Sequence, residues 1–191
     1  RIKGLDQFKG ALFHSADWQH DVQLQGKRVA VIGTGASAIQ FVPAIAGEVG
    51  ELLLFQRTPP WIVPKPDGAI PAPVRKVFKY IPPAQRLARH AIYWQSEFFG
   101  IGFVNPKLMA PISALAKSHL KRQVPNPELR AKLTPNYTIG CKRVLFSNNY
   151  YPALTRDNVQ VLTTGVKEIT ADGVLDAQGQ LHKVDVIICG T

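Results

Sequence analysis

The sequence is poor in cysteine and in long apolar runs. Only two cysteines, Cys141 and Cys189, occur among the 191 residues, so a disulfide framework is excluded and no CxxC pair begins a zinc site. We therefore expect no metal and a reducing compartment, the cytoplasm. The most apolar stretch, residues 91–104, is interrupted by polar side chains at 95–97. This leaves it short of the roughly 20 apolar residues of a membrane span.

Acidic residues are also scarce, since 13 Asp and Glu stand against 23 Lys and Arg, a formal net charge of +10. Such a balance needs an acidic partner, such as nucleic acid, an anionic membrane, a phosphorylated cofactor or a neighbouring domain. The basic residues are spread over the middle of the chain, which favours a solvated helical face, and we predict no nucleic-acid binding. The chain begins with Arg1 and shows no signal peptide, which suggests a piece of a longer polypeptide.

The sequence contains enough apolar residues to form a hydrophobic core, since 46% of its residues are hydrophobic and 19% are charged. In the first zone, residues 1–58, a continuous apolar strand is expected at 28–32, a helix at 36–49 and a second strand at 52–55. Pro43 predicts a kink or an early turn in that helix. This zone therefore reads as a βαβ unit.

The middle zone, residues 59–135, is punctuated by prolines, so strands are not expected there. Helical patterns at 84–99 and 111–124 predict a helical insertion. Aromatic side chains recur at helical spacing within it, and we expect them to be core rather than a membrane or partner face. They are Trp94, Phe98, Phe99 and Phe103.

The last zone, residues 136–191, returns to strands at 159–162, 166–170 and 184–189, with a hairpin through the turn signals Asp172-Gly173 and Gln178-Gly179. The order of elements predicts an α/β fold. We expect a Rossmann-type domain with a parallel sheet that is interrupted by the helical insertion and completed by the C-terminal strands and the hairpin.

A glycine-rich motif directly follows the first strand and matches G-x-G-x-x-[GA]. Gly33 permits the tight turn, Gly35 lets the backbone approach a pyrophosphate, and Ala38 is small enough for helix and strand to pack. The alternative is a glycine-rich turn without a ligand. The residues expected at the cofactor are Gly33, Thr34, Gly35, Ala36, Ser37, Ala38, Ile39 and Gln40.

The end of the second strand indicates which dinucleotide binds. A carboxylate there would accept hydrogen bonds from a free ribose 2′-hydroxyl, but the sequence has Arg57 and Thr58 instead. A guanidinium suits a 2′-phosphate. The sequence therefore predicts NADP(H) rather than NAD, unless Arg57 is merely a surface arginine.

Upstream of the turn, Phe8, Gly10, His14 and Trp18 form the pattern F-x-G-x-x-x-H-x-x-x-W. This spacing resembles the fingerprint of the Baeyer-Villiger monooxygenases, within the class B flavoprotein monooxygenases. Gln19 follows the tryptophan where the family usually has Pro or Asp. Further matching segments are residues 33–40 (GTGASAIQ), 55–59 (FQRTP), 140–143 (GCKR), 149–152 (NYYP), 156–159 (RDNV) and 185–191, which is similar to the family's D-x-[IV]-[IV]-x-A-T-G strand but has Gly190 near the usual alanine.

The resemblance implies roles by position. Residues 34–40, Arg57 and Thr58 would hold NADPH, and Lys142 would add a cation near the 2′-phosphate. Arg143 stands where the family has its catalytic arginine, which stabilises the anionic intermediates of oxygen transfer to a ketone. The fingerprint residues would lie on the link between the FAD and NADP domains and couple domain movement to catalysis.

The resemblance also implies an FAD site, yet no second G-x-G-x-x-G motif occurs in the sequence. We expect the FAD-binding domain to be absent from this chain and the chain to be inactive alone. The leading interpretation is the NADPH-binding part of a flavoenzyme that inserts one oxygen atom beside a ketone carbonyl, giving an ester or lactone. Alternatives are an N- or S-oxygenating flavin-containing monooxygenase, or a non-catalytic NADP-binding module.

Overall fold

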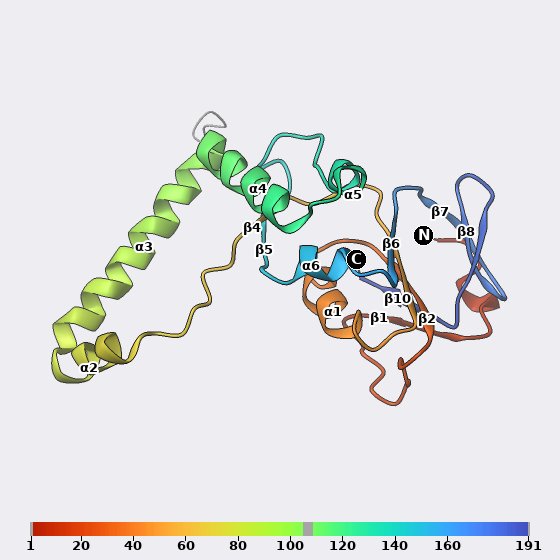
Figure 1. Cartoon of the computed structure of the whole chain (residues 1–191), viewed down its shortest axis with the longest axis horizontal. Helices are drawn as coiled ribbons and strands as arrows, with labels where there is room; N and C mark the ends of the chain where they lie inside the picture. Colours follow the sequence, from red (N-terminus) through yellow and green to blue (C-terminus); the bar gives the residue numbers. More distant parts are fainter. Residues whose placement is uncertain (1, 105–108, 191) are drawn as a thin grey trace.

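The fold centres on a five-stranded sheet in which every pairing is parallel (Figure 1). The computed structural model describes residues 2–104 and 109–190. The strands lie in the order β1-β10-β2-β3-β6. Their bounds are β1 Ala11–His14, β10 Val186–Cys189, β2 Arg28–Ile32, β3 Glu51–Phe55 and β6 Val159–Leu162. The predicted Rossmann-type sheet is confirmed, with strands from the end of the sequence placed on both sides of the first βαβ unit.

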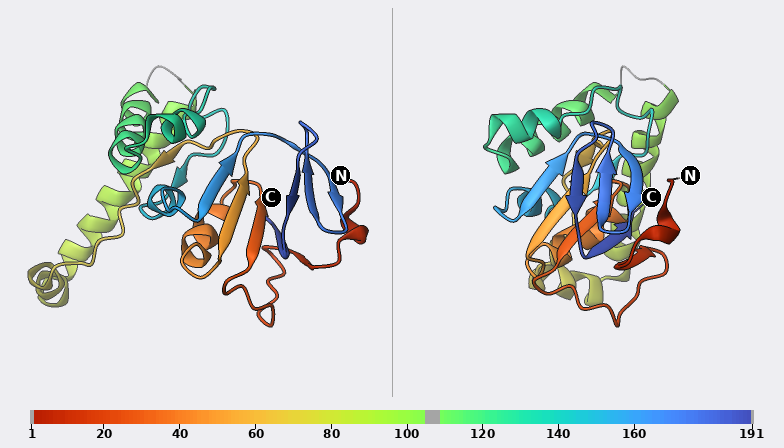
Figure 2. Two further views of the ribbon diagram at one scale, coloured as in Figure 1. Left: turned by 45° about the vertical axis from the view of Figure 1, so that its right-hand side comes forward. Right: turned by 90° about the vertical axis from the view of Figure 1, so that its right-hand side faces the viewer.

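Two hydrophobic clusters cover the two faces of this sheet, because successive strand residues point to opposite sides. Val29 and Val31 of β2 face helices α1 (Ala38–Ile45) and α6 (Tyr150–Leu154). Ala30 and Ile32 face a small antiparallel sheet. That sheet consists of β7 (Val166–Thr170), β8 (Gly173–Asp176) and β9 (Leu181–Lys183), and Figure 2 shows it on the side opposite α1 and α6. The predicted hairpin turns are therefore confirmed as parts of a separate three-stranded layer.

The middle zone is mainly helical, as predicted. It contains α2 (Ala72–Tyr80), α3 (Pro82–Val104), α4 (Ala110–Gln123) and α5 (Pro127–Lys132). A short 3-10 helix, η1 (Leu5–Gln7), lies outside this zone near the N-terminus. The prediction that this zone has no strand is wrong. Two residues, β4 (Ile62–Val63), pair in parallel with β5 (Leu145–Phe146). Helix α1 is shorter than predicted and continues through Pro43 to Ile45.

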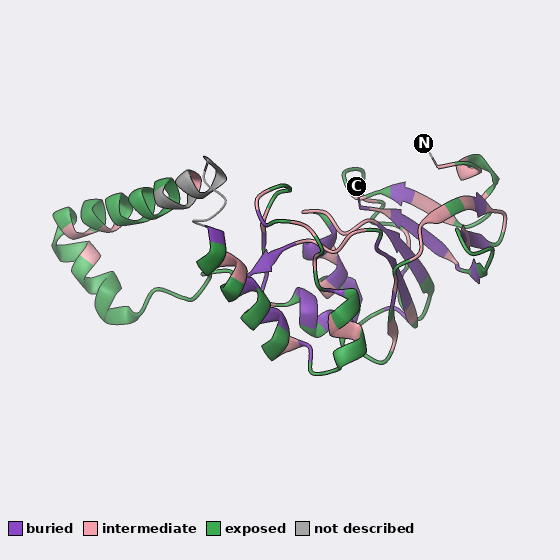
Figure 3. Cartoon of the chain, turned by 90° about the horizontal axis from the view of Figure 1, so that it is seen from above, coloured by how far each residue is buried: buried purple, intermediate pink, exposed green. Residues whose placement is uncertain are grey.

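Helices α2 and α3 form an arm that extends away from the sheet, and over residues 72–97 most of its side chains are exposed (Figures 1 and 3). Trp94 was expected in the core, but 67% of it is exposed. The prediction was wrong because a helical apolar pattern identifies an apolar face without identifying what covers it. The side chains of Phe98, Phe99 and Phe103 lie outside what the structure describes.

Across residues 2–104 and 109–190, none of the helices combines the length and the apolarity that crossing a bilayer requires.

Candidate functional site

The candidate site lies at the carboxyl edge of the parallel sheet, where the turn after β2 sits between its two neighbours β3 and β10. Gly33 has a φ of 108°, a region that side-chain-bearing residues rarely adopt. Its amide donates to the carbonyl of Phe55 at the end of β3, at 3.1 Å. The order of strands reverses direction at β2, and open α/β sheets bind their ligands at such a point.

The N-terminus of α1 opens onto this turn. Ser37 at its cap makes no side-chain capping hydrogen bond. The amides of Ile39 and Gln40 already donate to the carbonyls of Gly35 and Ser37, at 3.2 and 3.0 Å, so the donors that a ligand could use lie earlier in the glycine turn. The helix approaches the sheet closely, since Ala38 is fully buried. A Cβ added to Gly190, directly after β10, would lie 3.3 Å from the Cβ of Ala38. Small residues at both positions allow this approach.

A pocket of about 310 Å³ gathers most of the predicted cofactor residues. Arg57, Lys142 and Arg143 line it, and among the described residues no carboxylate lines it and none of these three cations has an ion-pair partner. The hydroxyl of Thr34 donates to the carbonyl of Thr58 at 3.3 Å and ties the glycine turn to the segment after β3. The complete lining is Gly33, Thr34, Gly35, Ala36, Arg57, Thr58, Pro60, Tyr137, Lys142, Arg143 and Leu145.

The small sheet β4-β5 brings the two basic segments together. Ile62 of β4 pairs with Leu145 of β5 in a parallel register. The chain enters both strands from the same end, so the residues just before β4 and just before β5 lie side by side. Arg57 precedes β4 by five residues and Lys142 precedes β5 by three, and both line the pocket although they are 85 positions apart in the sequence.

The rest of the glycine motif lies away from this pocket. Ser37 and Gln40 are exposed, and Ile39 is buried in the core. The side chain of Gln40 donates to the carbonyl of Ala36 at 3.1 Å. These residues hold the helix rather than line the pocket.

The fingerprint residues also lie outside the pocket. Phe8 is half-buried against the cluster under the antiparallel sheet, and Gly10 lies directly against the main chain of Asp185. His14 ends β1 opposite Cys189, and its Nδ1 accepts a hydrogen bond from the amide of Ala16 at 3.0 Å.

Trp18, the last fingerprint residue, packs on the face of the sheet that carries α1. Its ring lies 5.3 Å from the ring of Phe13 and 5.3 Å from that of Phe41 in α1. The tryptophan thus fastens the segment after β1 to the first helix. In this structure Trp18 therefore contributes to the packing between the sheet and α1.

The sequence analysis missed three lining residues, Pro60, Tyr137 and Leu145, of which Tyr137 contacts a predicted site residue. The ring of Tyr137 lines the pocket, and burial raises the pKa of its phenol. The ammonium of Lys142 lies 4.8 Å from the centre of this ring. The only sequence signal was an aromatic residue five positions before Lys142.

Arg143 and Arg57 each border a second cavity. Arg143 also lines a mostly apolar cavity of about 450 Å³ between β4, β5 and α4, whose walls include Val63, Ile112 and Phe146. Arg57 also lines a cavity of about 340 Å³ that reaches Val166 in the antiparallel layer. Each arginine therefore lies between the candidate pocket and one neighbouring cavity.

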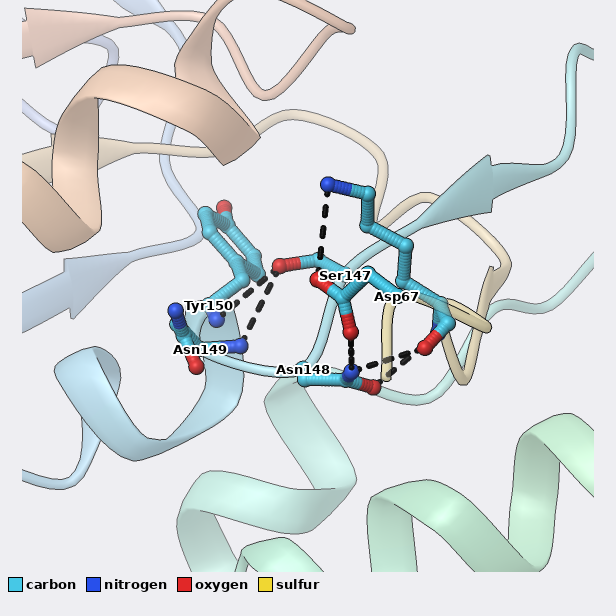
Figure 4. A network of polar contacts seen from close by, with 6 residues as sticks. Asp67, Ser147, Asn148, Asn149 and Tyr150 are labelled. Carbon is cyan, nitrogen blue, oxygen red and sulfur yellow. Dashed lines mark hydrogen bonds and ion pairs between the residues drawn. The ribbon is translucent and has the colours of Figure 1, made fainter. Parts of the chain in front are cut away.

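The loop after β5 is fixed by a polar network (Figure 4). The side chain of Asn148 accepts from the amide of Lys65 at 3.0 Å and donates to the Lys65 carbonyl and the Asp67 carboxylate, each at 2.8 Å. The hydroxyl of Ser147 accepts from the amide of Tyr150 at 3.2 Å, at the start of α6. The network joins the linker that leads to the exposed arm to the segment that follows Arg143 and β5.

Comparison with known proteins agrees with this architecture. Residues 1–73 match the family model described as flavin-binding monooxygenase-like. The whole chain is 52% identical to a Baeyer-Villiger monooxygenase of Pseudomonas aeruginosa and covers 36% of that protein. The similarity to this Baeyer-Villiger monooxygenase extends over the whole chain, which spans about a third of the relative's length.

Solved structures show the same fold. An oxidized steroid monooxygenase bound to NADP superimposes on the whole chain with a TM-score of 0.82 at 26% identity, and the match covers 44% of that protein. A complex of OTEMO with FAD and NADP gives a TM-score of 0.79 at 28% identity, with 43% of that protein covered.

Two motifs by which the sequence resembles the Baeyer-Villiger family have structural explanations. The Asp185 carboxylate accepts from the amide of Arg28 at 2.9 Å and from its guanidinium at 3.1 Å, which ties β10 to β2. Asn158 donates to the carbonyls of Ala46 and Val49, each at 2.9 Å, and holds the end of α1. Both residues therefore hold the sheet and α1 together.

Proposed function

We propose that this chain binds NADPH as part of a flavin-dependent Baeyer-Villiger monooxygenase. The observation that carries the proposal is the pocket at the carboxyl edge of β2, where the glycine turn that leads into α1 faces three cations and, among the described residues, no carboxylate. Backbone amides at such a helix end bind pyrophosphate. The donor set of this pocket therefore fits a phosphorylated dinucleotide.

The segment after β3 favours the phosphorylated nucleotide over NADH. Arg57 and Lys142 both line the pocket there, and neither makes an ion pair among the described residues. A 2′-phosphate would supply the missing negative charge, whereas a free 2′-hydroxyl would leave both cations without a partner. Arg57, Thr58 and Lys142 would hold the phosphate, and residues 33–36 the pyrophosphate. Residues 37–40 would set the position of the turn.

Arg143 is our candidate catalytic residue. A guanidinium is a planar cation with several donors and can stabilise a negatively charged oxygen. Because Arg143 lines both the nucleotide pocket and the apolar cavity beside β4 and β5, a ketone could place its carbonyl at Arg143 and its carbon skeleton among apolar side chains. Bound NADPH would supply the hydride that reduces the flavin. One oxygen atom of O2 would then enter the product, an ester or a lactone, and the other would leave as water.

The division of the chain follows from this assignment. Residues 1–58 and 136–191 would form the NADP-binding unit, and residues 59–135 the helical insertion. The FAD would be held by a domain of the same polypeptide outside this chain, with Phe8, Gly10, His14 and Trp18 coupling the two domains. We place the enzyme in the cytoplasm.

The test is calorimetric titration of the complete polypeptide with NADPH and with NADH at fixed salt. Hydrogen bonds to charged groups contribute about 1.5–3 kcal/mol, so Arg57→Ala should weaken NADPH binding about ten- to a hundred-fold and leave NADH binding unchanged. Arg75→Ala is the matched control, because Arg75 is an exposed arginine of α2 outside the pocket. Equal affinity of the native protein for both nucleotides would contradict the proposal.

A further inference from the structure

The pocket contains a cation–π pair. The ammonium of Lys142 lies over the ring of Tyr137, 4.8 Å from its centre. Both residues line the pocket that also holds the glycine turn and Arg57. Lys142 is exposed whereas Tyr137 is half-buried. The ring is therefore the more fixed partner of the pair.

Tyr137 is held from behind by Trp61, which is only 5% exposed. The indole N–H of Trp61 donates to the carbonyl of Tyr137 at 2.9 Å. The two rings meet edge to face, with centres 6.5 Å apart. These contacts fix both the main chain and the ring of Tyr137 at the wall of the pocket.

A turn brings Lys142 back over this ring. The amide of Cys141 donates to the carbonyl of Thr138 at 3.2 Å. Gly140 lies inside this turn with a φ of 97°, in the left-handed region that favours glycine. The chain thus reverses between Tyr137 and Lys142, which explains how residues five positions apart come into contact.

We propose that Tyr137 is a positioning residue for nucleotide choice, whose ring holds the Lys142 ammonium where the 2′-phosphate of NADPH binds. The inference rests on the proposed function. A lysine side chain loses rotamer entropy when it is immobilised. A ring that already restrains the ammonium reduces that loss on binding. The ammonium has three donors, so one side can face the ring while another faces a phosphate.

The effect is specific to the phosphorylated nucleotide. The 2′-hydroxyl of NADH carries no charge and gains little from a prepositioned cation. Because burial raises the pKa of Tyr137, its phenol stays neutral at physiological pH and does not repel the phosphate. Loss of the ring should therefore weaken NADPH binding and leave NADH binding unchanged.

The experiment compares dissociation constants for NADPH and NADH in the complete polypeptide by calorimetry. A cation–π pair at an exposed site contributes about 0.5–1 kcal/mol, so Tyr137→Leu should lower the preference for NADPH about two- to five-fold. Tyr137→Phe, which keeps the ring, should retain the native preference. Tyr137→Met fills the space beside Trp61 without a ring and should behave as Tyr137→Leu does.

The chain provides a matched control. Lys79 lies 5.4 Å from the ring centre of Tyr80 on the exposed arm, so Tyr80→Leu breaks a similar pair outside the pocket and should leave the preference unchanged. In a Lys142→Met background, Tyr137→Leu should have no further effect on the preference.

Equal weakening of NADPH and NADH by Tyr137→Leu and Tyr137→Met, or no change in either, would overturn the inference while the proposed function stands. If the native protein shows no preference for NADPH, the proposed function fails and the inference fails with it.

Discussion

The fingerprint glycine Gly10 offers a sharp test of how the sheet is assembled. A Cβ added to Gly10 would overlap the main-chain carbonyl oxygen of Asp185, the residue before β10, and would come within 2.7 Å of the Phe8 ring. The φ of Gly10 is not positive, so alanine could adopt its backbone conformation. The expected penalty of Gly10→Ala is therefore purely steric.

The magnitude follows from what can move. Phe8 is a side chain and can turn aside, but the carbonyl of Asp185 belongs to a segment fixed by a hydrogen bond from its own amide to the carbonyl of Arg28, at 2.8 Å. Overpacking of this kind costs about 1–3 kcal/mol, and the rigid partner places Gly10→Ala in the upper part of that range. Replacing glycine also restricts the unfolded chain, which offsets about 0.4–1 kcal/mol. The net loss in the free energy of unfolding should be about 1–2 kcal/mol.

The assay is equilibrium denaturant unfolding of the native protein, Gly10→Ala and Gly68→Ala. Gly68 is the control, because a Cβ there would meet nothing within 4 Å and its φ is not positive. Gly68→Ala should be neutral or slightly stabilising. If Gly10→Ala is no less stable than Gly68→Ala, the close approach of Gly10 to Asp185 is not what requires glycine in the fingerprint.

Two further predictions concern packing and acid stability. Trp18→Ala should lower the free energy of unfolding by about 2–3 kcal/mol, because the indole contacts both Phe13 and Phe41; its NADPH affinity, measured on the folded protein, should be unchanged because Trp18 lies outside the pocket. Hydrogen bonds from Arg28 hold the pKa of Asp185 below its usual range, so the stability from this pair is complete above about pH 4 and is lost as the pH falls through the lowered pKa. Asp185→Asn should therefore be less stable than the native protein at pH 6 and show a smaller drop from pH 5 to pH 3; parallel pH profiles of the two proteins would refute this assignment.

The two strands predicted in the first zone share one property, which is a nearly continuous apolar run buried on both faces. Residues 28–32 and 52–55 are such runs, and they form β2 and most of β3. β1 was missed because it is a four-residue edge strand whose only partner is β10, at the other end of the chain. No local pattern reports a pairing between residues 11 and 186. Long-range pairing is a property of the folded sheet.

In the exposed arm the sequence predicted the helix correctly and the burial of its aromatic residue Trp94 incorrectly. Its apolar side chains recur at helical spacing, which correctly predicted α3. Periodicity gives the direction of the apolar face, but burial depends on a second surface that lies elsewhere in the fold. Trp94 has no such cover among the described residues, and it stays 67% exposed.

The candidate site depends on an element that periodicity cannot detect. The glycine turn and Arg57 follow predicted strands, and parallel strands place their carboxyl ends at one edge, so their meeting could be expected. Lys142 and Arg143 follow no strand. They reach the pocket because two residues of β5 pair in parallel with two residues of β4, and two residues are too few for an alternation of side chains to appear.

The resemblance to a family supplied the roles of Lys142 and Arg143 without the geometry, and it did not include Tyr137. The ring of Tyr137 enters the pocket only through the contact of its loop with Trp61, directly before β4. The same short pairing thus explains both why the basic residues converge and why one member of the site could not be found from the sequence.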